Sequence, residues 1–127
     1  MTDEPIPNQI RQFILRSIDS VAQLEALLLL RANPRENWTT VSISKRLYIS
    51  EQETAPLLTN LCDQGLVVLN ELTEFTYQPA SAELSQMVDS LAAIYARHLV
   101  PVTNLIHSKP RSRMQEFADA FRLRKDE

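Results

Sequence analysis

Hydrophobic positions in the first third of the chain predict two helices. Residues at intervals of three and four lie on one face of a helix, and the chain begins with such a set: Ile10, Phe13, Ile14 and Ile18. Ser20 is suited to cap a second helix, which is apolar on almost every side over residues 21–30. A helix with so little polar surface belongs in the centre of a core. Pro34 marks its end, because proline disfavours a helical residue before it.

Shorter elements follow over residues 38–65. Residues 38–41 are rich in strand-forming types and predict a short strand or an extended entry, and a short helix is predicted from Val41 to Tyr48. Ser50 and Glu53 have the spacing of a capping box, in which the hydroxyl accepts from a backbone N–H and the acid reaches back. The helix that starts there ends at Gly65, the residue type that most easily adopts the left-handed conformation of a helix exit.

A hairpin and further helices are predicted in the second half. Residues 66–69 and 74–77 are β-prone runs separated by turn-forming residues, which is the pattern of a β-hairpin. An apolar stripe over residues 81–107 predicts a long helix, which Pro101 must kink or split. A final short helix with a narrow apolar face is predicted from Ser112.

Composition narrows the class of protein. The chain has 127 residues, a net charge of −3 and one glycine, and this single glycine excludes glycine-rich phosphate loops. One cysteine excludes a disulfide framework and a multi-cysteine zinc site. The first residues are acidic and no apolar run approaches membrane-spanning length, so we expect a cytoplasmic protein without a membrane partner.

The order helix, core helix, short strand, short helix, capped helix, hairpin resembles a winged helix-turn-helix domain over residues 8–80. The likeness is closest over residues 41–77. Six residues are similar to the common end of the recognition helix and the first wing strand: Leu57, Leu58, Leu61, Gly65, Leu66 and Val67. The block resembles bacterial transcriptional regulators of the MarR type, and the later helices resemble their dimerisation helices.

The resemblance implies a mainly α fold with a small β-hairpin, a winged helix-turn-helix followed by long C-terminal helices. Residues 1–7 would be a disordered tail, residues 8–80 the winged-helix domain and residues 81–127 the dimerisation region. It further implies a non-enzymatic regulator that binds duplex DNA as a homodimer, with the second helix of the motif in the major groove.

The charge of the predicted recognition surface does not favour DNA. Residues 38–80 contain two basic and five acidic residues, and the capped helix has no lysine or arginine. DNA phosphates bind basic side chains, whereas the predicted hairpin carries the acidic residues Glu71 and Glu74. Five residues are the candidates for DNA or partner contact: Lys45, Arg46, Gln52, Thr54 and Thr59.

Two alternatives stay open. In the first, the winged helix is a protein-interaction adaptor that does not bind DNA. In the second, DNA meets another basic patch, for which Lys109, Arg111 and Arg113 are the candidates, although these charges can equally keep a surface helix solvated.

The apolar stripe after residue 81 is long for so small a domain. It can pack on the same helix of a second chain, or it can fold back over its own core as part of a monomer. We expect a homodimer, with five candidate interface residues: Leu84, Met87, Leu91, Tyr95 and Phe117.

The remaining reactive side chains predict no catalytic or metal site. His98 and His107 have no acid or cysteine at zinc spacing, and Cys62 is more simply a small packing residue than a redox sensor. No catalytic pattern is recognisable. We therefore expect neither cofactor nor metal.

Overall fold

The computed structural model describes residues 6–109, which are mainly helical with one small antiparallel hairpin. This confirms the predicted mainly α class. The predicted helix from Ser112 and three candidate residues, Arg111, Arg113 and Phe117, lie outside the described residues. The elements in chain order are α1 (Asn8–Ser17), α2 (Val21–Ala32), α3 (Thr40–Leu47), α4 (Glu51–Asp63), β1 (Val67–Leu69), β2 (Phe75–Tyr77), α5 (Ala82–Arg97) and a helical segment over residues 99–109.

Hydroxyl caps start four of the helices. The Ser20 hydroxyl accepts from the Gln23 N–H at 3.0 Å, and the Ser81 hydroxyl accepts from the Leu84 N–H at 3.1 Å. At α3, Thr39 and Ser42 form a capping box. Each cap satisfies a backbone donor that has no partner within the helix, so these local signals set where the helices begin.

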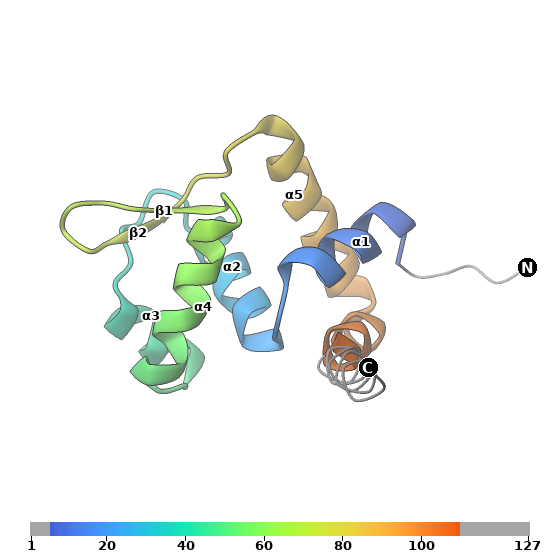
Figure 1. Cartoon of the computed structure of the whole chain (residues 1–127), viewed down its shortest axis with the longest axis horizontal. Helices are drawn as coiled ribbons and strands as arrows, with labels where there is room; N and C mark the ends of the chain where they lie inside the picture. The colour runs from blue at the N-terminus through green and yellow to red at the C-terminus, as the bar shows by residue number, and fades with distance from the viewer. Residues whose placement is uncertain (1–5, 110–127) are drawn as a thin grey trace, which may run out of the picture.

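The apolar helix α2 lies in the middle of the molecule (Figure 1). Its Leu24, Leu27 and Leu30 are completely buried. On one side α2 contacts α3, α4 and β2. Towards α5, its Arg31 pairs with Asp89 at 2.9 Å and its Glu25 accepts from the Tyr95 hydroxyl. The predicted central helix is therefore the element around which the two sides of the fold are arranged.

The hairpin pairs β1 with β2 in the register Val67–Tyr77, Val68–Thr76 and Leu69–Phe75. In the segment predicted as a short strand or an extended entry, Trp38 forms an isolated bridge to Phe75 and Thr39 is extended. The helix α3 then begins at Thr40, one residue earlier than predicted. The Thr39 cap starts a helix at the point where the strand pattern would have continued.

The long apolar stripe is split as predicted. The helix α5 ends at Arg97, and residues 99–109 are helical again after His98. Pro101 lies in the first turn of this second segment, where its missing N–H costs no helical hydrogen bond. The Val102 N–H bonds to the His98 carbonyl at 3.1 Å, which closes the new first turn.

One sequence expectation is corrected by the packing. Ile6 lies in the predicted disordered tail, yet it is 4% exposed and belongs to the core. Tyr48, at the predicted end of the short helix, is 93% exposed and takes a left-handed conformation with φ of 59° after α3. Among the described helices, none combines the length and apolar character that crossing a bilayer requires.

Candidate interaction surface

The outer face of α4 is the first part of the candidate surface. The Ser50 hydroxyl accepts from the Glu53 N–H at 3.1 Å and lies 3.4 Å from the Glu53 carboxylate. The predicted cap is therefore present, with the acid meeting the serine hydroxyl. Pro56 is exposed inside the helix, so the outer face also includes a residue that cannot donate a backbone hydrogen bond.

The structure separates the five predicted contact residues. Gln52 and Thr59 are exposed on α4, and Lys45 and Arg46 are exposed on α3. Thr54 is corrected: it is 0% exposed and its hydroxyl donates to the Ser50 carbonyl at 2.8 Å. A side chain so placed stabilises the first turn of α4 and cannot reach a ligand.

Negative charge dominates the outer face of α4. Glu51, Glu53 and Asp63 are all exposed, and α4 contains no lysine or arginine. Glu51 and Glu53 lie in the first turn, where the helix dipole favours an acid. Asp63 lies in the last turn, where the dipole opposes it. Helix stability therefore accounts for the first two carboxylates and leaves the third unexplained.

The hairpin next to α4 presents apolar side chains to solvent. Val68 is 43% exposed, Leu69 50% and Leu72 74%. The tip is held by Asn70, whose side-chain oxygen accepts from the Leu72 N–H at 2.9 Å and the Glu74 N–H at 3.0 Å. These local bonds fix Leu72 in a defined, outward position, and a run of exposed aliphatic groups is typical of an interaction surface.

A groove of about 550 Å³ runs between α4 and the start of α2. Its walls come from two regions that are far apart in sequence: residues 19–23 and the α4 stripe from Glu53 to Asp63. The lining combines the carboxylates of Asp19, Glu53 and Asp63 with apolar surface from Ala22, Pro56 and Leu57.

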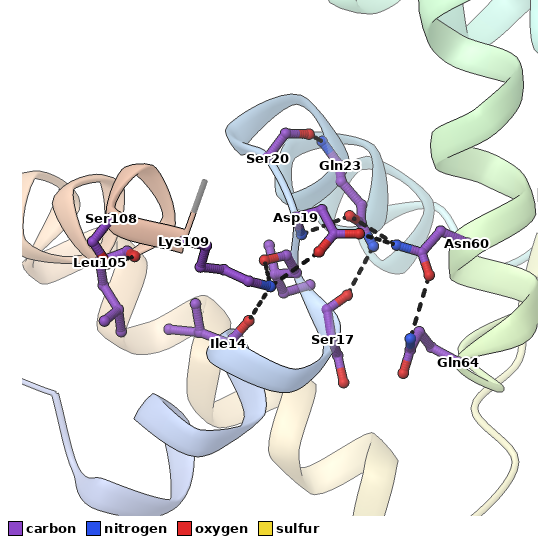
Figure 2. Close-up of polar contacts among 11 residues, drawn as sticks. Ile14, Ser17, Asp19, Ser20, Gln23, Asn60, Gln64, Leu105, Ser108 and Lys109 are labelled. Carbon is purple, nitrogen blue, oxygen red and sulfur yellow. Dashed lines mark hydrogen bonds and ion pairs between the residues drawn. The ribbon is translucent and has the colours of Figure 1, made fainter. Parts of the chain in front are cut away.

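A polar network under the groove joins the last described helix to α4 (Figure 2). The Lys109 ammonium donates to the carbonyls of Ile14 and Ile18 and to the Asp19 carboxylate, which lies 3.1 Å away. The other Asp19 oxygen accepts from the Asn60 side chain of α4 at 2.8 Å. Three elements therefore meet at one carboxylate.

Lys109 corrects the prediction of a basic patch. It is 5% exposed, and its ammonium is the cation that the α1 carbonyls and Asp19 require. A buried ammonium with three oxygen partners is a structural group. Of the three residues proposed for that patch, Lys109 is internal, while Arg111 and Arg113 lie outside the described residues.

The predicted dimer residues are largely used within the chain itself. Leu91 is 0% exposed and Tyr95 is 8% exposed, so both pack in the core of one chain and are corrected as surface contacts. Leu84 and Met87 are partly buried against the same core. Between residues 81 and 109, the large apolar residues that remain exposed are Leu99 at 54% and Val100 at 62%.

Sequence reasoning missed Asp19, Asn60 and Leu72. Asp19 and Asn60 meet across 41 positions, and no local pattern signals such a pair. Leu72 had a usable signal: an apolar residue between turn-forming neighbours at a hairpin tip has no core to enter. Its exposure could have been predicted from the hairpin alone.

The reactive side chains of the described part of the chain form no recognisable metal or nucleophile site. Burial, with a contribution from the Asp63 charge, raises the pKa of the Cys62 thiol, which disfavours the reactive thiolate. Within residues 6–109, no group of three His, Cys, Asp or Glu side chains could hold a metal ion.

Comparison with protein-family models, with curated proteins and with solved structures gave no match to this chain.

Proposed function

We propose that this chain is a non-enzymatic regulatory protein whose winged-helix-like domain binds another protein in place of DNA. The element order supports the winged-helix assignment: α2, α3 and α4 correspond to the helical core, and β1 and β2 to the wing. Residues 8–80 would form this domain, and the helices after residue 81 would complete it.

The observation that carries the proposal is the chemistry of the α4 and hairpin surface. Between Glu51 and Tyr77 there is no lysine or arginine, while Val68, Leu69 and Leu72 are exposed on the hairpin that follows α4. A phosphate backbone would meet uncompensated carboxylates there. Apolar side chains with a charged rim instead suit a protein partner.

Duplex DNA is the second candidate, because Lys45 and Arg46 are exposed on α3. The Arg46 guanidinium also lies over the Trp38 ring, 5.5 Å from its centroid, which fixes its position. Two cations next to an acidic helix supply a weak phosphate site compared with the six to ten contacts of a strong DNA binder.

A salt titration tests the choice between protein and DNA. Fluorescence anisotropy of a labelled random duplex is measured with the chain at about 20 mM and about 150 mM salt. We expect no binding at either salt concentration. Affinity at low salt that falls steeply at the higher salt would support the DNA regulator and contradict the proposal.

A second measurement tests the hairpin directly. Crosslinking captures from the source cells are compared for the wild type and for Leu72→Ser, with Val41→Ser as an exposed aliphatic residue outside the hairpin. A protein captured by the wild type and by Val41→Ser, but lost with Leu72→Ser, would support the wing as the contact surface. Equal capture by all three chains would contradict it.

We further propose that the regulator acts as a homodimer. Leu99 and Val100, with exposed fractions of 54% and 62%, lie together where α5 gives way to the next helix, and a second copy could cover them. Sedimentation of the wild type at micromolar concentration tests this. A monomer would contradict the homodimer and leave the protein-binding proposal unaffected.

A further inference from the structure

We infer that the groove between α4 and the start of α2 binds a short basic segment of the protein partner. This inference rests on the proposed protein-binding function and adds the chemistry of the ligand. The groove has carboxylates at its two ends, from Glu53 and Asp63, and apolar surface from Pro56 and Leu57 between them.

The spacing of the carboxylates sets the length of the segment. Glu53 and Asp63 are ten residues apart, which is about 15 Å along the axis of α4. An extended chain covers this distance in about four to five residues. In an extended segment, positions i, i+2 and i+4 face the same side, so two cationic side chains at i and i+4 and an apolar one at i+2 match the groove.

Two of the three carboxylates that line the groove form no ion pair among the described residues. Among residues 6–109, Asp19 is the groove carboxylate that forms an ion pair, whereas Glu53 and Asp63 have no basic partner. Asp63 also opposes the dipole of its own helix. A cation supplied by a partner would give Asp63 an ion-pair partner and would offset the unfavourable interaction with its helix dipole.

The Asp19 carboxylate in the groove wall is already engaged from inside the chain. The ammonium of Lys109, a buried side chain that does not line the groove, lies 3.1 Å from it (Figure 2). Because Asp19 is already bound to Lys109 and to Asn60, the ligand positions are assigned to Glu53 and Asp63. The carboxylates that attract a lysine in this groove would repel the phosphates of a nucleic acid.

The test uses the full chain and a defined peptide, Ac-GKALAKG-amide, which places two lysines and one leucine at the required spacing. Its titration is followed through the backbone amide signals in ¹⁵N–¹H NMR spectra. We expect saturable shifts at residues 19–23 and along α4. The peptide Ac-GQALAQG-amide, which lacks the charges, should cause none.

Two matched double variants separate the groove from overall charge. Glu53→Gln with Asp63→Asn removes two groove carboxylates, and glutamine at 53 can still accept from the Ser50 hydroxyl. Glu36→Gln with Glu83→Gln removes two exposed acids that do not line this groove. We expect the first to weaken peptide binding by about tenfold or more and the second by less than about twofold.

Equal weakening by both double variants, or no shift at millimolar peptide, would overturn the groove as a basic-segment site. If the duplex DNA titration is also negative, the broader protein-binding proposal survives that result. Shifts of the same amides by random duplex DNA would overturn both.

Discussion

Two acidic regions of this molecule use their charge in opposite ways. At the junction of α1, α2 and residues 99–109, Asp19 faces the buried Lys109 ammonium and accepts from Asn60. On the outer face of α4, Glu53 and Asp63 have no cation among the described residues. Acidic side chains therefore stabilise the fold at the Lys109 junction, whereas on α4 they are free to contact solvent or a ligand.

The difference separates stability from binding. A buried charge that loses its partner is costly, because the remaining group stays out of water without compensation. An exposed carboxylate can be neutralised at almost no cost to the fold. Substitutions at the Lys109 junction and in the core beneath it should thus lower the free energy of unfolding, while substitutions of the exposed α4 carboxylates should change binding alone.

The largest effect is expected for the core of the terminal helices. Leu91→Ala removes a completely buried side chain, and we expect a loss of about 3 kcal/mol in the free energy of unfolding. Leu72→Ala, which changes a leucine that is 74% exposed at the hairpin tip, should change it by less than about 0.5 kcal/mol. Urea denaturation followed by circular dichroism measures both, and similar losses would contradict the assignment of Leu91 to the core.

The Lys109 junction should follow. Lys109→Met keeps most of the side-chain volume but removes the cation that pairs with Asp19 and the lysine hydrogen bonds to the Ile14 and Ile18 carbonyls. Since Asp19 is partly exposed, we expect a cost of about 2–3 kcal/mol. Lys45→Met, on the exposed surface of α3, is the control and should be neutral. Equal stability of the two variants would show that the buried ammonium contributes nothing.

The contact between α5 and α2 gives a pH-dependent prediction. Burial, and then the hydrogen bond and charge of Glu25, raise the pKa of Tyr95 from 10.0 to about 12. The neutral phenol is thus favoured in the folded chain, so its contribution is complete below pH 10 and is lost as pH rises towards 12.

Tyr95→Phe tests this sign. At pH 7 the variant should be about 1 kcal/mol less stable than the wild type, because the 2.9 Å bond to Glu25 is lost. Between pH 10 and 12 the difference should shrink and then reverse, since the wild-type phenol ionises first in the unfolded chain. A difference that stays constant over this range in urea denaturation would contradict the raised pKa.

The local elements of this fold could be predicted because local chemistry sets them. Serine at positions 20, 50 and 81 caps the helices that the pattern assigned to it. Gly65, with φ of +75°, forms the predicted exit from α4 and has the Ala80 Cβ 3.4 Å from where its own would be. These features depend on residues a few positions apart.

The candidate surface was only half predictable. Thr54 shares a helix face with Leu58 and Leu61 at intervals of four and seven, so its burial was readable from the same periodicity that placed the leucines. Lys109 contacts Ile14 across 95 positions. Because Lys109 lies in a basic stretch, the sequence predicted that its side chain would be exposed to solvent. Which charge is buried depends on how distant elements pack, and no spacing rule reports that.

The smallest effect, and the one of opposite sign, is expected on the α4 side at Tyr48. This residue has φ of 59° and ψ of 40° between α3 and α4, with 93% of its surface exposed. A side chain in this conformation is strained, whereas glycine adopts it freely. Tyr48→Gly should therefore raise the free energy of unfolding by about 0.5–1 kcal/mol.

Tyr48→Ala is the matched control, because it removes the ring and keeps the strained Cβ. We expect no gain from alanine, so that the difference between the two variants in urea denaturation isolates the backbone. Equal stability of the glycine and alanine variants would show that the ring, and not the backbone, determines the effect. A gain with glycine alone would show that the left-handed backbone at position 48 lowers stability in the turn that leads into α4. This turn lies on the side of the molecule whose carboxylates have no cation among the described residues.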